Sequence, residues 1–266
     1  MDKTGKMGAA LVAFFCLAAL FAPWISPYPA HGVDVSAMLL PPSAKHWLGT
    51  DALGRDVLSR LIEGSRVSLI VGVGASLVSV GIGVFLGALA GYFRGWVDAF
   101  LMRVVDVMLS LPTLFLVLAV VAFLNQGIVP MTLVIGATSW MGVSRLTRAE
   151  FLSLSERAFV LAAKGLGASW ARIAFVHMLP HAFAPVAVAG TLGVAQNILL
   201  ESALSFLGLG MPPPTASWGS VLREGFDNIQ FAWWLNLFPG VAILLCVLGY
   251  HLLGEGLRQS LWQRNA

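Results

Sequence analysis

The sequence is short of charge and of cysteine. Asp, Glu, Lys and Arg together make up 11% of the 266 residues, whereas hydrophobic residues make up 58%, and the mean hydropathy is +0.84. In soluble globular domains about a quarter of the residues are charged, so this class is excluded. The two cysteines, Cys16 and Cys246, stand in apolar segments without a CxxC pair or a histidine at ligand spacing. Neither a disulfide framework nor a structural zinc site is therefore expected.

Sequence motifs of common enzymes are also missing. There is no GxxxxGK(S/T) phosphate loop, so the chain does not bind and hydrolyse ATP in the usual way. HExxH, GxSxG and a pair of intramembrane aspartates are absent as well. The net charge of +3 needs no nucleic-acid partner, because the basic residues are distributed as membrane topology demands. We expect no catalytic residue, no cofactor and no bound metal in this chain.

Six apolar segments are present, and they set the expected fold. A helix that spans a bilayer needs about 20 mostly apolar residues, because the backbone in hydrocarbon must satisfy its own hydrogen bonds. We therefore expect an all-α, polytopic membrane protein with about six transmembrane helices, of which the fourth is short. The segments are residues 7–25, 67–92, 104–124, 127–143, 183–205 and 231–253.

The first apolar segment is interpreted as a membrane anchor. Lys3 and Lys6 precede it, as basic residues precede the apolar region of a signal peptide. However, Pro23, Trp24 and Ile25 offer no small-residue cleavage site.

Basic residues are divided unevenly between the two sides that six spans create. With the N-terminus inside, eleven of the sixteen Lys and Arg residues fall in inner segments and five in outer segments. Because Lys and Arg are retained on the cytoplasmic side during insertion, we expect both termini in the cytoplasm. The expected organisation is an N-terminal helix with an outer loop (1–65), a five-helix core (66–260) that contains a cytoplasmic loop (145–182), and a cytoplasmic tail (261–266).

A polar, arginine-bearing segment separates the fourth and fifth spans. Residues 157–176 are good helix formers with a surface of small residues, and Leu179-Pro180 is interpreted as a stop and re-entry signal. The pattern fits a short helix that inserts into a groove on a soluble partner. It fits equally an amphipathic helix that lies on lipid headgroups and is held there by its basic residues.

The spacing of small residues in this segment resembles the EAA loop, the cytoplasmic coupling loop of permease subunits of bacterial ABC importers. Ala-Ala is followed after three residues by Gly, after nine more by a residue that is usually Ile, and after one further residue by Leu-Pro. Leu161 stands where the family has Glu, and His177 where it usually has Ile. The resemblance implies that an ATPase subunit contacts this loop, and the residues that match the pattern are Leu161, Ala162, Ala163, Gly167, His177, Leu179 and Pro180. A metal site at His177 and His181 is not expected, because Pro180 intervenes and no third ligand is near.

Further motifs extend the resemblance over nearly the whole chain, in the expected order. They look like the C-type permease subunit of dipeptide, oligopeptide or nickel importers, and they lie at residues 46–51, 53–60, 204–210, 213–214, 217–219 and 253–258. The resemblance implies a type I ABC importer permease fold in the bacterial inner membrane. It also implies a second homologous permease subunit, two ATP-binding subunits that carry ATP and Mg²⁺, and an extracytoplasmic substrate-binding protein.

The nature of the transported solute is less well indicated. Peptide is preferred to nickel, because only His31 and His46 fall in outer segments. A membrane scaffold that does not transport would explain the spans but not the ordered motifs. The alternative of an intramembrane enzyme would require polar side chains that converge on one point within the membrane.

Polar residues in the fifth span are candidates for a transport pathway. Gln196, Asn197 and Glu201 form a stripe at roughly helical spacing, which either lines a cavity or makes hydrogen bonds between helices.

Small residues in two other places predict local structure. Gly83, Gly87 and Gly91 form a small-xxx-small stripe that permits close helix contact, either with a partner subunit or within the chain. Residues 49–51 and 54–56 predict turns with side-chain capping in the outer loop.

Overall fold

The computed structural model describes residues 3–262, and within them the chain is helical, with one isolated β-bridge between Thr50 and Asp56. The predicted all-α membrane fold is confirmed. The helices are α1 (Lys3–Leu20), α2 (Ala22–Ile25), η1 (Val35–Ala37), α3 (Val57–Phe93), α4 (Gly95–Ser110), α5 (Thr113–Val121), α6 (Ile128–Ala137), α7 (Met141–Leu154), α8 (Ala158–Gly165), α9 (Trp170–Arg172), the π-helical η2 (Ile173–Met178), α10 (Leu179–Phe206), α11 (Trp218–Asp227) and α12 (Trp234–Trp262). Residues 263–266 of the expected tail lie outside the described residues.

Among the described residues, four helices are long and apolar enough to cross a membrane. They comprise Lys3–Leu20, Val57–Phe93, Trp170–Phe206 and Trp234–Leu261, and they correspond to the first, second, fifth and sixth predicted spans. The second and fifth extend beyond their predicted starts, since α3 begins at Val57 and the helix that contains α10 begins at Trp170.

The third and fourth predicted spans are not single helices. Instead of one helix over 104–124, α4 and α5 form a pair bent by 88°, which raises the count of candidate spans to five if the pair is one span. Pro112 causes the break, because proline disfavours helical backbone at the preceding residue, and Leu111 is indeed extended. Instead of a helix over 127–143, the ten-residue α6 ends at Ala137 and α7 begins at Met141.

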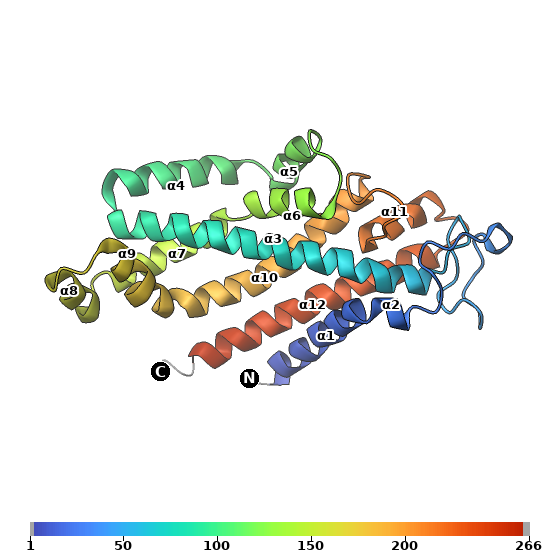
Figure 1. Ribbon diagram of the computed structural model, residues 1–266, viewed down its shortest axis with the longest axis horizontal. Helices are drawn as coiled ribbons and strands as arrows, with labels where there is room; N and C mark the ends of the chain where they lie inside the picture. The colour runs from blue at the N-terminus through green and yellow to red at the C-terminus, as the bar shows by residue number, and fades with distance from the viewer. Residues whose placement is uncertain (1–2, 263–266) are drawn as a thin grey trace.

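The long helices lie side by side along the long axis of the molecule (Figure 1). Helix α3 runs through the middle and packs against α6, α7 and α10; in this view α4, α5 and α6 lie above it, and α10, α12 and α1 lie below it. The short α8 projects from one end of the bundle, and the loop over residues 26–56 covers the opposite end. We call these the α8 end and the loop end. The start of α1 and the end of α12 both point toward the α8 end.

The glycine stripe of α3 packs inside the chain, against α7. A Cβ added at Gly83 would stand 2.8 Å from the carbonyl oxygen of Trp140, and one at Gly91 would stand 2.9 Å from that of Arg148. Gly87 lies between them, against Ser144. Of the two interpretations that the sequence left open, internal packing is the one that the structure adopts.

A buried charge cluster holds the loop end together. The carboxylate of Asp51 accepts hydrogen bonds from Arg55 Nε at 2.6 Å and from Arg60 Nη1, and both arginines also reach Glu224 on α11. Asp51 is fully buried, and Arg60 is 2% exposed. The cluster therefore joins the loop, the start of α3 and α11.

The predicted capped turns are also present in this loop. Asp56 caps α3 by accepting from the backbone N–H of Ser59 at 2.9 Å. Asp51 accepts from the backbone N–H groups of Leu53 and Arg55 at 2.8 and 3.0 Å.

Candidate functional site

The segment between α7 and α10 begins with α8, whose C-terminal end depends on Gly167. The backbone N–H of Ala168 donates to Ala163 O at 3.1 Å, and that of Gly167 donates to Lys164 O at 3.0 Å. These two bonds form a Schellman motif, which needs a residue in the left-handed region just after the helix. Gly167 supplies it with φ +75°.

One face of α8 packs on the bundle, and the other is free. Val160 is fully buried in a cluster with Phe151, Ile173 and Met178, and Ala163 packs against the same cluster. On the outer face, Leu161 is 54% exposed and Leu166 is 88% exposed. Ala162 and Gly167 are exposed as well. The exposed part of the segment thus combines small residues and two leucines with the basic side chains of Arg157 and Lys164.

The Leu-Pro pair does not end a helix, so the predicted stop signal is wrong. His177 lies in η2, Leu179 and Pro180 lie in the first turn of α10, and one helix runs from Trp170 to Phe206. Proline clashes with the carbonyl four residues earlier in an α-helix. That residue is Val176, and the chain meets the constraint by widening into a π-helical turn over Ile173–Met178.

No metal site is formed by the histidines of this segment. His181 stacks on Phe159, with ring centroids 4.8 Å apart. Across the described part of the chain, no group of three His, Cys, Asp or Glu residues is placed to hold a metal ion.

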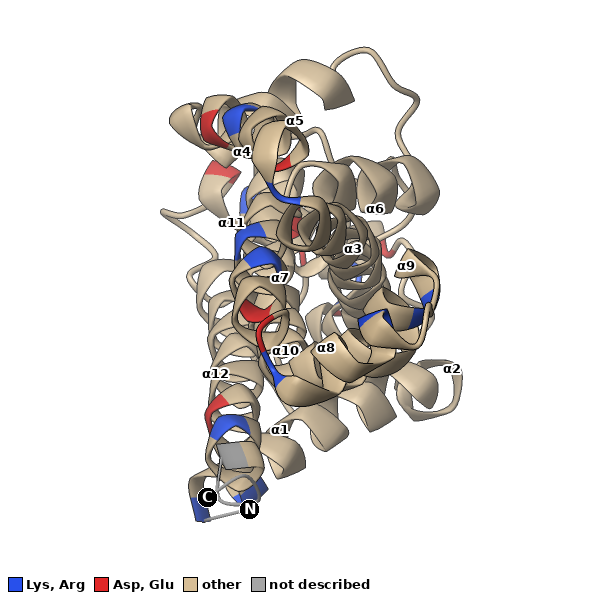
Figure 2. Cartoon of the chain, turned by 90° about the vertical axis from the view of Figure 1, so that its left-hand side faces the viewer, with Lys and Arg blue, Asp and Glu red and all other residues tan. Residues whose placement is uncertain are grey.

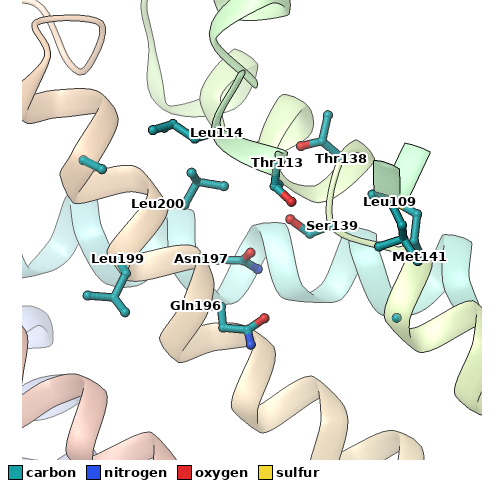
Figure 3. A pocket seen from close by; sticks show the side chains of 12 residues that line it. Leu109, Thr113, Leu114, Thr138, Ser139, Met141, Gln196, Asn197, Leu199 and Leu200 are labelled. Carbon is teal, nitrogen blue, oxygen red and sulfur yellow. The ribbon is translucent and has the colours of Figure 1, made fainter. Parts of the chain in front are cut away.

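The breaks between α4 and α5 and between α6 and α7 face α10 across a cavity of about 540 Å³ (Figure 3). Its polar lining comes from both breaks and from α10, and its apolar lining is mainly leucine. The side chains of Thr113, Ser139 and Asn197 point into a common space. The polar residues that line it are Thr113, Thr138, Ser139, Gln196 and Asn197.

A second cavity of about 230 Å³ adjoins the first and shares Ser139, Gly142, Gln196 and Asn197 with it. It is lined further by α3 and by α10 as far as Ala189. Together the two cavities follow α10 from Ala189 to Ala203, a length of about 21 Å at 1.5 Å per residue. We call this combined space the trough. None of the described residues that line it is charged.

The three polar candidates of the fifth span have different environments. Gln196 is exposed to the trough, and Asn197 lines it with only 3% of its surface exposed. The Nδ2 of Asn197 is buried and has no hydrogen-bond partner in the part of the chain that the structure describes. A buried donor without a partner costs about 1–3 kcal/mol.

Glu201 does not line the trough. It is fully buried, and its carboxyl group accepts from Ser68 Oγ at 2.8 Å and from Ser205 Oγ at 2.7 Å. Glu201 thus links α10 to α3, as expected of a polar residue that makes hydrogen bonds between helices.

Several trough residues were not predicted from the sequence. They come from the two helix breaks and from α3, and they include Thr113, Thr138, Ser139, Ser76 and Ser79. Proline interruptions in apolar segments are a known pointer to transport sites, so Pro112 was the available signal for the first break.

Comparison with known proteins identifies the family. The model of the binding-protein-dependent transport system inner membrane component matches residues 83–264. The chain belongs to this family of transport permeases. A second model, the N-terminal TM domain of oligopeptide transport permease C, matches residues 1–42.

Individual relatives are similar over nearly the full chain. The di/tripeptide transport system permease protein DppC of Pseudomonas aeruginosa is 43% identical over 94% of this chain and 84% of its own length. The putative peptide permease protein BRA0407/BS1330_II0404 of Brucella suis is 42% identical over 97% and 86%. The oligopeptide transport system permease protein OppC of Bacillus subtilis is 34% identical over 98% and 85%. The permease is therefore a multi-pass membrane protein of a binding-protein-dependent transport system.

Proposed function

We propose that this permease is the C-type subunit of an ATP-driven peptide importer and forms half of the translocation pathway. The trough is its share of the pathway, and a second homologous permease subunit supplies the other half. The names of the relatives, which are peptide permeases, favour peptide over nickel as the solute.

The exposed face of α8 is the proposed contact with an ATP-binding subunit. Helix α8 projects beyond the start of α1 and the end of α12 (Figure 1), so a soluble partner can reach it at that end of the bundle. Leu161 on α8 and Leu166, the residue that caps its C-terminal end, are the most exposed large apolar side chains there. They fit a groove on a soluble partner in the way that an apolar helix face usually does.

The orientation that accompanies this proposal places the α8 end in the cytoplasm. Viewed from that end, Lys and Arg residues lie near α7, α9 and the two ends of the chain (Figure 2). The loop end then faces outward, where a substrate-binding protein delivers the solute. ATP and Mg²⁺ are held by the two ATP-binding subunits, and this chain performs no catalysis.

The observation that carries the proposal is the continuous helix from Trp170 to Phe206. It begins beside α8 and contains the trough residues Gln196 and Asn197, about 40 Å away at 1.5 Å per residue. A movement imposed on α8 is therefore transmitted to the pathway by a rigid element. ATP binding closes the two ATP-binding subunits, draws the two coupling segments together and turns the trough outward, which is alternating access driven by differential binding of ATP to two states.

Charge placed on the exposed face of α8 tests the proposal. Leu166→Asp should abolish co-purification of the ATP-binding subunits with the permease pair, because an apolar contact would then bury an unpaired carboxylate. Leu53→Asp is the matched control, since Leu53 is 46% exposed in the loop at the opposite end. Normal association of the Leu166→Asp complex, with normal peptide uptake into vesicles, would overturn the assignment.

A further inference from the structure

We propose that Asn197, with Thr113 and Ser139, forms a contact site in the trough for the backbone amide groups of the solute. The site contacts the peptide groups of the solute, so it accepts peptides whatever the charge of their side chains. The inference rests on the proposed function, because it takes the trough as the pathway, and it adds what the pathway recognises.

The lining of the trough is polar but neutral. Hydroxyl and carboxamide groups come from α5, from the break before α7 and from α10, and no charged residue is among the described lining residues. The larger cavity, of about 540 Å³, falls within the range of small-molecule sites. A bare divalent cation needs carboxylate, imidazole or several oxygen ligands, whereas a neutral lining of hydroxyls and amides suits an organic solute.

The proposed site depends mainly on Asn197, because the Nδ2 donor of its side chain makes no hydrogen bond to a described residue. Buried polar groups almost always have a partner, yet Nδ2 of Asn197 has none among the described residues. A peptide offers one carbonyl acceptor and one N–H donor at every unit. The carboxamide of Asn197 matches a carbonyl of that kind, and the neighbouring carboxamide of Gln196 is exposed to the same space and offers both a donor and an acceptor.

The contact depends on the conformation of the permease. Because Nδ2 of Asn197 is covered here, a solute carbonyl reaches it only when α10 moves apart from the helix breaks. The hydrogen bond then exists in the widened, occupied state and not in the empty one. A ligand that bonds one state better shifts the equilibrium toward it, so this contact favours the open trough while peptide is inside.

The test uses the complete importer, with both permeases, both ATP-binding subunits and the binding protein, in proteoliposomes. The solutes are Ala-Ala, Lys-Ala, Glu-Ala and Ni²⁺, and each uptake rate is normalised to saturation of the binding protein. Wild-type importer should take up the three peptides at rates within about threefold of one another. Asn197→Leu should lower all three rates at least tenfold while the ATP-binding subunits stay bound.

Two further variants complete the test. Asn236→Leu is the matched control, because Asn236 also has a buried Nδ2 without a partner among the described residues but does not line the trough; its uptake should stay within twofold of wild type. Asn197→Asp is nearly isosteric, so it preserves assembly, and its charge should make Lys-Ala uptake exceed Glu-Ala uptake by at least fivefold.

The possible failures are distinguishable. If wild-type importer takes up no peptide with ATP, or takes up Ni²⁺ instead, the proposed function fails. If wild-type peptide uptake is normal and both Asn197 variants behave like wild type, the amide site fails and the proposed function stands.

Discussion

Gly87 on α3 lies directly against Ser144 on α7, so closely that even a methyl group at Gly87 would overlap the carbonyl oxygen of Ser144. With Gly83 and Gly91 one turn away on either side, it lets α3 and α7 approach backbone to backbone.

This packing predicts a steep cost for side chains on the stripe. Gly87→Val should destabilise the permease by about 3 kcal/mol or more, at the upper end of overpacking effects, because the obstacle is backbone that cannot rotate away. Gly81→Val is the control on the same helix, since nothing lies within 4 Å of a Cβ at Gly81. Thermal unfolding in detergent measures both, and equal melting temperatures would contradict the close packing.

The charge cluster at the loop end should be sensitive to loss of its central carboxylate. Asp51→Asn leaves Arg55 and Arg60 with Glu224 alone, and breaking a buried ion pair typically costs about 3–5 kcal/mol. Arg66→Gln removes an exposed pair with Glu63, 3.5 Å apart, and should cost less than about 1 kcal/mol. Denaturation of the two variants compares them, and a small effect for Asp51→Asn would show that the cluster does not hold the loop.

Gly167 should be required for its backbone conformation rather than for its small size. Nothing lies within 4 Å of a Cβ there, but φ is +75°, and an ordinary residue in that region costs about 1–2 kcal/mol. Gly167→Val should unfold the end of α8 and uncouple ATP hydrolysis from uptake, whereas Gly167→Asn should remain coupled, because asparagine tolerates this region. The ratio of ATP hydrolysed to peptide imported in vesicles is the measurement. Normal coupling in the valine variant would refute the role of this turn.

Glu201 should affect stability and not the transport rate of folded permease. Glu201→Leu leaves the hydroxyls of Ser68 and Ser205 without their acceptor inside the bundle, and a buried polar group without a partner costs about 1–3 kcal/mol. Glu201→Gln keeps one carbonyl oxygen and should lose less. Uptake per assembled complex should be unchanged in the glutamine variant, and a selective loss of uptake at full stability would instead place Glu201 in the pathway.

Local sequence was sufficient wherever a feature depends on a short stretch of chain. Long apolar runs predicted the helices that contain α3, α10 and α12, because a buried backbone in lipid has almost no alternative to a helix. The capping role of Asp56 followed from its place before a helix-forming run. The two helix breaks were not predicted, because the hydropathy of a segment shows whether it is long enough to span a membrane but not whether it forms one continuous helix.

The sequence by itself determined the membrane-spanning helical class, the capped turns of the outer loop and the order of motifs that indicated the family. Tertiary structure alone decided that the glycine stripe meets α7, that Glu201 is bonded between helices, and that Asn197 faces a trough while Glu201 does not. The physical reason is distance along the chain. Periodicity fixes which face of a helix a residue occupies, but what lies opposite that face depends on segments such as Thr113 and Ser139, which are more than 50 residues from Asn197 and meet it only when the bundle packs.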